Sequence, residues 1–162
     1  MLKNLINNET PLVICDIGAS SVDPTAFIDE LIKNVDCFLY GFEPNEEEFK
    51  KLNSTNKKKY FNYAVGNGQI ETLNICFAPG MTSILEPDFE YLKLFHGFSD
   101  WAKVTKKVKV QTKKLDDVNF DKKIDFLKID VQGYEHEVIK NGNKTIKDCL
   151  VVQIETSPIP LY

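Results

Sequence analysis

The segment Leu12–Ser20 constrains the fold of this chain more than any other stretch. Its first part, Leu12–Ile14, is a short apolar run with β-branched residues, which is typical of a strand buried on both faces of a parallel sheet. The run leads into Asp16-Ile17-Gly18, and the carboxyl ends of parallel strands are where open α/β sheets bind ligands. Because aspartate and glycine are also ordinary turn residues, the pattern gains weight only if it recurs along the chain.

The pattern does recur. Three later apolar runs also end in an acid, namely Cys37–Glu43, Ile124–Asp130 and Leu150–Glu155. A segment with helical spacing of its apolar residues follows the first strand, beginning with a capping Asp23 and Pro24 and closing at Asn34. This alternation predicts an α/β fold: a single domain over residues 1–162 with a doubly wound, mostly parallel, Rossmann-like sheet and its site along one edge.

Two segments break the alternation. Residues 71–77 and 107–112 alternate polar and apolar side chains, which predicts an inserted antiparallel pair of strands with one wet face. Between them, residues 80–103 are rich in aromatic and small polar residues, including Tyr91 and Trp101. This insertion is either a lid over a substrate pocket or a partly buried segment that covers the sheet, and the pattern favours neither.

Composition excludes several classes of partner. The formal net charge is -4, and all 20 basic residues are lysines, so neither nucleic acid nor an anionic membrane surface is an expected partner. No apolar run is long enough to span a bilayer. The 4 cysteines lie in apolar runs without a C-x-x-C pair, and the N-terminus lacks the pattern of a signal peptide. We therefore expect a cytoplasmic protein with reduced thiols.

Two strand ends mark where a nucleoside could bind. A carboxylate at the tip of the second strand, Glu43, can accept hydrogen bonds from the two hydroxyls of a ribose. Glu43-Pro44-Asn45 is also a common kind of surface turn, but its position at the strand tip favours the functional interpretation. A third parallel strand is expected to run to about Val65. Its end, Tyr63–Gly66, is positioned to contact an adenine ring with apolar side chains and backbone groups.

Three stretches resemble the FkbM-type methyltransferases, a family within the S-adenosylmethionine-dependent, Rossmann-like class. They are Asp16–Ser20, Gly41–Asn45 and Phe126–Glu135, and the last is the most specific. The resemblance covers nearly the whole chain. It implies S-adenosylmethionine as the cofactor, and O-methylation of a hydroxyl group on a sugar, another glycan or a different small-molecule acceptor.

The resemblance also assigns residues to the cofactor by position. The implied cofactor-binding residues are Asp16, Gly18, Ala19, Glu43, Pro44, Ala64, Val65 and Asp130. Asp16 and Gly18 border the methionine end in this interpretation, and Glu43 binds the ribose. Ala64 and Val65 pack near the adenine. Asp130 stands at its strand end, facing the transferred methyl group and the acceptor.

An alcohol acceptor must lose its proton to a base within hydrogen-bond reach. The candidates are Asp130, Glu135, His136 and His96. Asp130 is the preferred site residue, and its role as a base, an orienting group or a metal ligand stays open. His136 is the second, because a position near a helix start disfavours the protonated imidazole, although an exposed histidine without a role is the commoner case. Asp130 and Glu155 end neighbouring strands and could hold Mg²⁺, but two solvated acids are the simpler interpretation, so no metal is predicted.

The chain differs from the family pattern in three places. Val22 stands where the family has a glycine, and Gln132 where it more often has glutamate. The family's C-terminal strands have no counterpart after Leu150–Glu155, which would leave an apolar edge that a second copy of the chain could cover. Two alternatives stay open. The first is a nicotinamide-dependent oxidoreductase, although the chain lacks the G-x-G-x-x-G run that binds a pyrophosphate in such enzymes. The second is a non-catalytic or partner-dependent methyltransferase-like domain.

Overall fold

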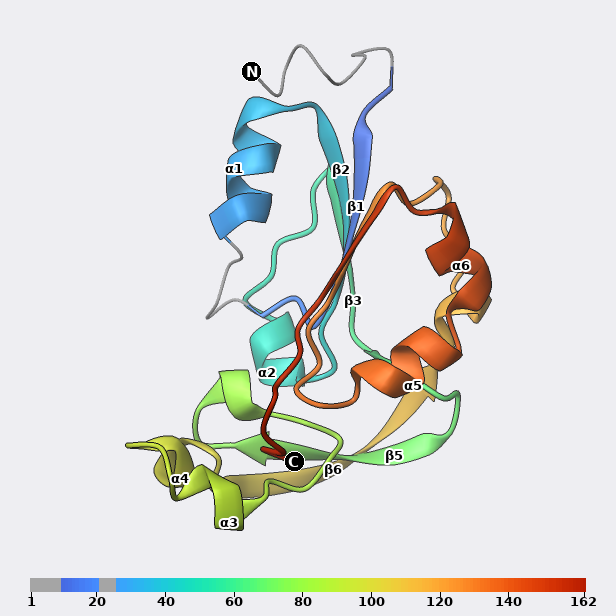
Figure 1. Cartoon of the computed structure of the whole chain (residues 1–162). Helices are drawn as coiled ribbons and strands as arrows, with labels where there is room; N and C mark the ends of the chain where they lie inside the picture. Colours follow the sequence, from blue (N-terminus) through green and yellow to red (C-terminus); the bar gives the residue numbers. More distant parts are fainter. Residues whose placement is uncertain (1–9, 21–25) are drawn as a thin grey trace.

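The centre of the protein is a five-stranded sheet whose neighbouring strands are all parallel, seen in a computed structural model that describes residues 10–20 and 26–162 (Figure 1). The strand order is β3-β2-β1-β7-β8. The strands are β1 (Leu12–Ile17), β2 (Cys37–Phe42), β3 (Lys58–Phe61), β7 (Phe126–Ile129) and β8 (Val151–Ile154). The chain builds outward from β1 to β3, then returns to β7 on the other side of β1. The sheet therefore has a topological switch point between β1 and β7, where such folds bind ligands.

Helices cover both faces of this sheet, as the alternation predicted (Figure 1). Helix α1 (Ala26–Asn34) lies on one face, and α5 (Glu135–Lys140) and α6 (Asn143–Asp148) lie on the other. Because successive strand residues point to opposite faces, Ile14 packs with the α1 side while Cys15 and Ile17 pack with the α5 side. The central strand is buried on both faces, which explains its continuous apolar run.

A second, three-stranded sheet lies beyond the carboxyl ends of the parallel strands (Figure 1). Its strands are β4 (Ala64–Val65), β5 (Ile70–Cys76) and β6 (Val104–Lys113). Strands β5 and β6 pair antiparallel, which confirms the predicted insertion, and β4 pairs parallel with β6. The remaining short helices are α2 (Glu46–Phe49), η2 (Pro79–Met81), α3 (Phe89–Leu92), α4 (Phe98–Trp101) and η3 (Leu115–Asp117).

One prediction about the parallel sheet is wrong. The third parallel strand is Lys58–Phe61, and Val65 belongs instead to β4 of the second sheet. Strand β3 begins with lysines, so it lacks the apolar run by which the other parallel strands were predicted. An edge strand tolerates them, because the backbone pairs on one side with β2 while the long side chains reach solvent.

The outer strand β8 is an apolar edge, as predicted. Leu150 is 75% exposed and Val151 50% exposed, and within the part of the chain that the structure describes no strand pairs with the outer side of β8. The predicted helix cap at Asp23 and Pro24, and the difference at Val22, fall outside the described residues. Among the described helices, none combines the length and apolar character needed to cross a membrane.

Candidate active site

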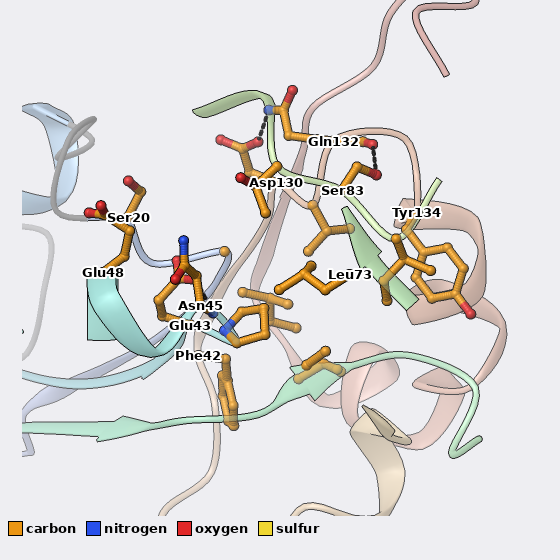
Figure 2. A pocket seen from close by; sticks show the side chains of 18 of the residues that line it. Ser20, Phe42, Glu43, Asn45, Glu48, Leu73, Ser83, Asp130, Gln132 and Tyr134 are labelled. Atoms are coloured by element: carbon orange, nitrogen blue, oxygen red, sulfur yellow. Dashed lines mark hydrogen bonds between the residues drawn. The ribbon is translucent and has the colours of Figure 1, made fainter. Parts of the chain in front are cut away.

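A pocket opens at the switch point, between the carboxyl ends of β1, β2 and β7 and the second sheet (Figure 2). One side of it carries Ser20, Glu43 and Asn45, and the opposite side carries Ser83 and Asp130. Leu73 and other apolar side chains of the second sheet complete the lining. The pocket thus joins an apolar wall to a few polar groups, which is the usual make-up of a small-molecule site.

Gly18 brings the ends of β1 and β7 into direct contact. It has a φ of 90°, and a Cβ at this position would lie 1.8 Å from the backbone oxygen of Asp130. Its amide donates to the carbonyl of Phe42 at 3.0 Å, which ties the same turn to β2. Only glycine fits both the conformation and the space, so it allows β1 and β7 to approach this closely at the edge of the pocket.

Glu43 is a nearly buried carboxylate in the pocket wall. It is 8% exposed, and its Oε1 accepts a hydrogen bond of 2.7 Å from the amide of Asn45. Asn62 fixes the turn from outside by donating to the carbonyl of Glu43 at 2.9 Å. Burial raises the pKa of Glu43 to about 7, despite the Asn45 hydrogen bond, which favours the charged form. Hydroxyl donors from a ligand would stabilise the ionised carboxylate.

Lys128 lies buried between two carboxylates, behind the wall of the pocket. Its Nζ is 3.2 Å from Asp16 Oδ1 and 3.0 Å from Asp130 Oδ2. Burial opposes the charge on Lys128, but the two neighbouring carboxylates more than offset this and raise its pKa. Asp16 differs from Asp130, because burial outweighs Lys128 and raises the pKa of Asp16. The cluster therefore places a cation directly behind Asp130.

The turn after Asp130 is held by a network of hydrogen bonds. Gln132 has a φ of 55°, which is unusual for a residue with a side chain, and its carbonyl accepts a hydrogen bond of 2.6 Å from Ser83 (Figure 2). Glu135 accepts from the amides of Val131 at 2.9 Å and Gly133 at 3.1 Å. These hydrogen bonds hold the backbone of Gln132 in its left-handed conformation, which is unfavourable for a residue with a side chain.

Six of the eight predicted cofactor-binding residues line the pocket. They are Gly18, Glu43, Pro44, Ala64, Val65 and Asp130. Asp16 and Ala19 are not among the lining residues. Asp16 lies behind the wall with Lys128, and Ala19 is buried with its amide bonded to the carbonyl of Phe42 at 2.9 Å.

Of the candidate bases, the structure brings only Asp130 to the pocket. His136 is exposed on the first turn of α5, and His96 is exposed between α3 and α4; neither lines the pocket. Glu135 uses its carboxylate to hold the turn at Val131. Among the described residues, no group of three or more acidic, histidine or cysteine side chains is placed to hold a metal ion.

The sequence reasoning missed several residues of this site. A signal for Lys128 was present, because a charged residue in the otherwise apolar run of β7 must find a buried partner. Ser83 and Leu73 gave no such signal, since their place in the pocket depends on how the second sheet docks. The lid predicted over 80–103 stays a prediction. Residues 80–84 reach the pocket, while Tyr91 and Trp101 do not line it.

The parallel sheet, with its pocket at the switch point, is a Rossmann-like fold. A family model described as the methyltransferase FkbM domain matches residues 16–162, so the chain belongs to the FkbM methyltransferase family. A crystal structure of methyltransferase FkbM from Methylobacillus flagellatus KT has a similar fold, with a TM-score of 0.54 and 14% sequence identity. The match covers 93% of this chain and 34% of that one, so the chain spans about a third of that protein. A comparison with curated proteins finds no significant match.

Proposed function

We propose that the pocket binds S-adenosylmethionine and that the chain transfers its methyl group to a hydroxyl of a small molecule or glycan. The observation that carries the proposal is the convergence of Gly18, Glu43 and Asp130 on one pocket at the switch point. These residues come from three strand ends that are far apart in the sequence. The same three lie within the residues matched by the family model.

The chemistry of the lining fits the parts of this cofactor. Glu43 offers a buried carboxylate, which can accept hydrogen bonds from two ribose hydroxyls. Gly18 lines the pocket where β1 and β7 meet, beside Asp130, which is where the methionine end would lie. Ala64 and Val65 supply buried apolar surface for the adenine. A cofactor bound in this way would have its methyl group near Asp130, which lines the pocket together with Gln132 and Ser83.

S-adenosylmethionine supplies a methyl group that is already activated by its sulfonium. The protein therefore has to align the acceptor oxygen, exclude water and provide for the acceptor's proton. Alignment alone can contribute roughly 7–11 kcal/mol to lowering a barrier. Asp130 is the candidate for contact with the acceptor hydroxyl, because it lines the pocket and Lys128 holds its carboxylate in place.

The test is calorimetric titration of the chain with S-adenosylmethionine, S-adenosylhomocysteine and NAD. We expect the first two to bind and NAD not to bind. Glu43→Ala should abolish the binding, while Glu46→Ala should preserve it, because Glu46 is exposed on α2 and does not line the pocket. Binding of NAD alone would point to the oxidoreductase alternative. Absence of binding by all three would overturn the proposal.

Methyl transfer is tested separately, with a panel of sugars and small alcohols and mass-spectrometric detection of a methylated product. Asp130→Asn should lower the rate by roughly 10²–10⁴-fold, the usual contribution of a positioned acid or base. If the cofactor binds and no hydroxyl compound in a broad panel is methylated, the hydroxyl-directed part of the proposal fails while the cofactor assignment stands.

A further inference from the structure

Asp130 and Glu155 form a pair of carboxyl groups at the edge of the pocket. They follow the neighbouring strands β7 and β8, and the side-chain amide of Gln132 bridges them. The Nε2 of Gln132 donates to Asp130 Oδ1 at 2.9 Å and to Glu155 Oε2 at 2.8 Å (Figure 2 shows the first of these bonds). Both amide protons are therefore used to hold the two acids together.

Tyr162 fixes the orientation of that bridge. Its hydroxyl lies 3.1 Å from the Oε1 of Gln132 and can donate to it. The ring of Tyr162 packs against Gly133, where a Cβ would lie 3.1 Å from a ring carbon. The hydroxyl of Tyr162 also lies 3.3 Å from the carbonyl oxygen of Met81, and donation to Gln132, the shorter of the two contacts, agrees with an amide nitrogen that faces the carboxylates. A flipped amide would set its oxygen against two acids, so the bridge has one stable arrangement.

The two acids differ in their surroundings. Asp130 lines the pocket and its other oxygen, Oδ2, contacts Lys128 at 3.0 Å. Glu155 is exposed and lies on the solvent side of the pair. Two adjacent carboxylates disfavour double ionisation, so the pair tends to retain one proton. The surroundings favour placing that proton on Glu155.

The pKa directions agree with this division. The hydrogen bond with Asp130, then burial, then the negative charges of Asp130 and Glu135 raise the pKa of Glu155 to about 8, against a smaller opposing effect of Lys128. For Asp130, burial opposes ionisation, but the hydrogen bond with Glu155 and the charge of Lys128 hold its pKa below the usual value. Below about pH 8 the pair therefore has an inner group, Asp130, that is ionised and an outer group, Glu155, that carries a proton.

We propose that Asp130 and Glu155 act as one proton-accepting pair, in which Asp130 takes the acceptor's proton inside the pocket and Glu155 passes it to solvent. This inference rests on the proposed function. In the transfer step, the acceptor oxygen forms a bond to the methyl carbon while the methyl–sulfur bond breaks, and that bonding pair goes to sulfur. The acceptor's proton moves to Asp130 and then to Glu155. Sulfur loses one positive charge and the pair gains one proton, so charge is conserved.

The pair must be ionised before it can accept this proton. The sulfonium of S-adenosylmethionine carries a positive charge that S-adenosylhomocysteine lacks, and a cation beside Asp130 favours loss of the proton from Glu155. A group with a pKa of about 8 is about half protonated at pH 8. Binding of S-adenosylmethionine at pH 8 should therefore release up to about half a proton more than binding of S-adenosylhomocysteine.

The experiment counts these protons by titration calorimetry at pH 8, in two buffers that differ in their enthalpy of ionisation. We expect the difference between the two ligands in the wild type, its loss in Glu155→Gln, and its persistence in Glu90→Gln, where the exposed glutamate lies on α3. Equal proton release for both ligands in the wild type would overturn the proposal that Asp130 and Glu155 act as one proton-accepting pair. Binding of neither ligand would instead refute the proposed function.

A second measurement needs no ligand. Carbon-13 NMR of the carboxyl groups follows the titration of Glu155, whose signal is identified by its absence in Glu155→Gln. We expect a midpoint near pH 8, shifted toward the ordinary glutamate value in Asp130→Asn. A wild-type midpoint near pH 4.5 would overturn the inference whether or not the cofactor binds.

Discussion

Replacing Lys128 with methionine tests how the charge cluster behind the pocket wall is stabilised. The lysine side chain is 8% exposed and contacts Asp16 at 3.2 Å and Asp130 at 3.0 Å. With an effective dielectric constant of about 20, each contact is an attraction of roughly 5 kcal/mol before the cost of desolvation. Methionine has nearly the same length but no charge, so Lys128→Met leaves two buried carboxylates facing each other without a cation.

We expect Lys128→Met to lower the free energy of unfolding by about 3–5 kcal/mol at pH 7, the usual cost of removing one partner from a buried ion pair. The cost should depend on pH. Without the lysine, the folded-state pKa of Asp130 is no longer held down, and the pKa of Asp16, which burial already raises in the wild type, rises further. Both then lie above the unfolded values near 3.9, so the variant loses stability as the pH rises above about 4. The wild-type contribution of Lys128, whose folded pKa is raised, is constant over this range and is lost only above about pH 10.

The assay is urea denaturation followed by far-ultraviolet circular dichroism at pH 7 and pH 4.5. Lys147→Met is the matched control, because Lys147 is exposed at the end of α6. Its cost should stay within about 0.5 kcal/mol at both values. A cost for Lys128→Met below about 1 kcal/mol, or one that is equal at the two pH values, would refute the account of a buried cation holding two acids.

Three further predictions concern the rest of the site. The pKa of Glu43 is raised from 4.5 to about 7, so stability should fall as the pH rises between these values, and Glu43→Gln should be more stable than wild type at pH 8 by up to roughly 3 kcal/mol in urea denaturation. Equal stability at pH 8 would contradict the burial of a charge. Gly18→Ala should cost at least about 3 kcal/mol, because its Cβ would meet the backbone of Asp130 at 1.8 Å, while Gly80→Ala, with nothing within 4 Å, should be nearly neutral by thermal melting. Tyr162→Phe should cost about 1 kcal/mol in urea denaturation through the lost hydrogen bond of its hydroxyl, and no measurable change would mean that water replaces it.

The sequence by itself determined the parallel sheet and the two acids that matter most in the pocket. Short apolar runs that end in an acid report local conformation, and the order of an α/β sheet brings such ends to one edge. Glu43 and Asp130 were found in this way, and both line the pocket. The third strand was misplaced because the lysines that open β3 do not follow that apolar pattern.

Only the tertiary structure decided how these acids are tuned. Lys128 and Asp16 are 112 positions apart, and they meet because β7 pairs with β1. The bridge at Gln132 depends on Ser83 and Tyr162, which come from distant segments. Periodicity along a chain reflects the residues within a few positions. Burial and hydrogen bonding depend on which strands become neighbours, and these contacts decide which carboxyl group keeps its proton.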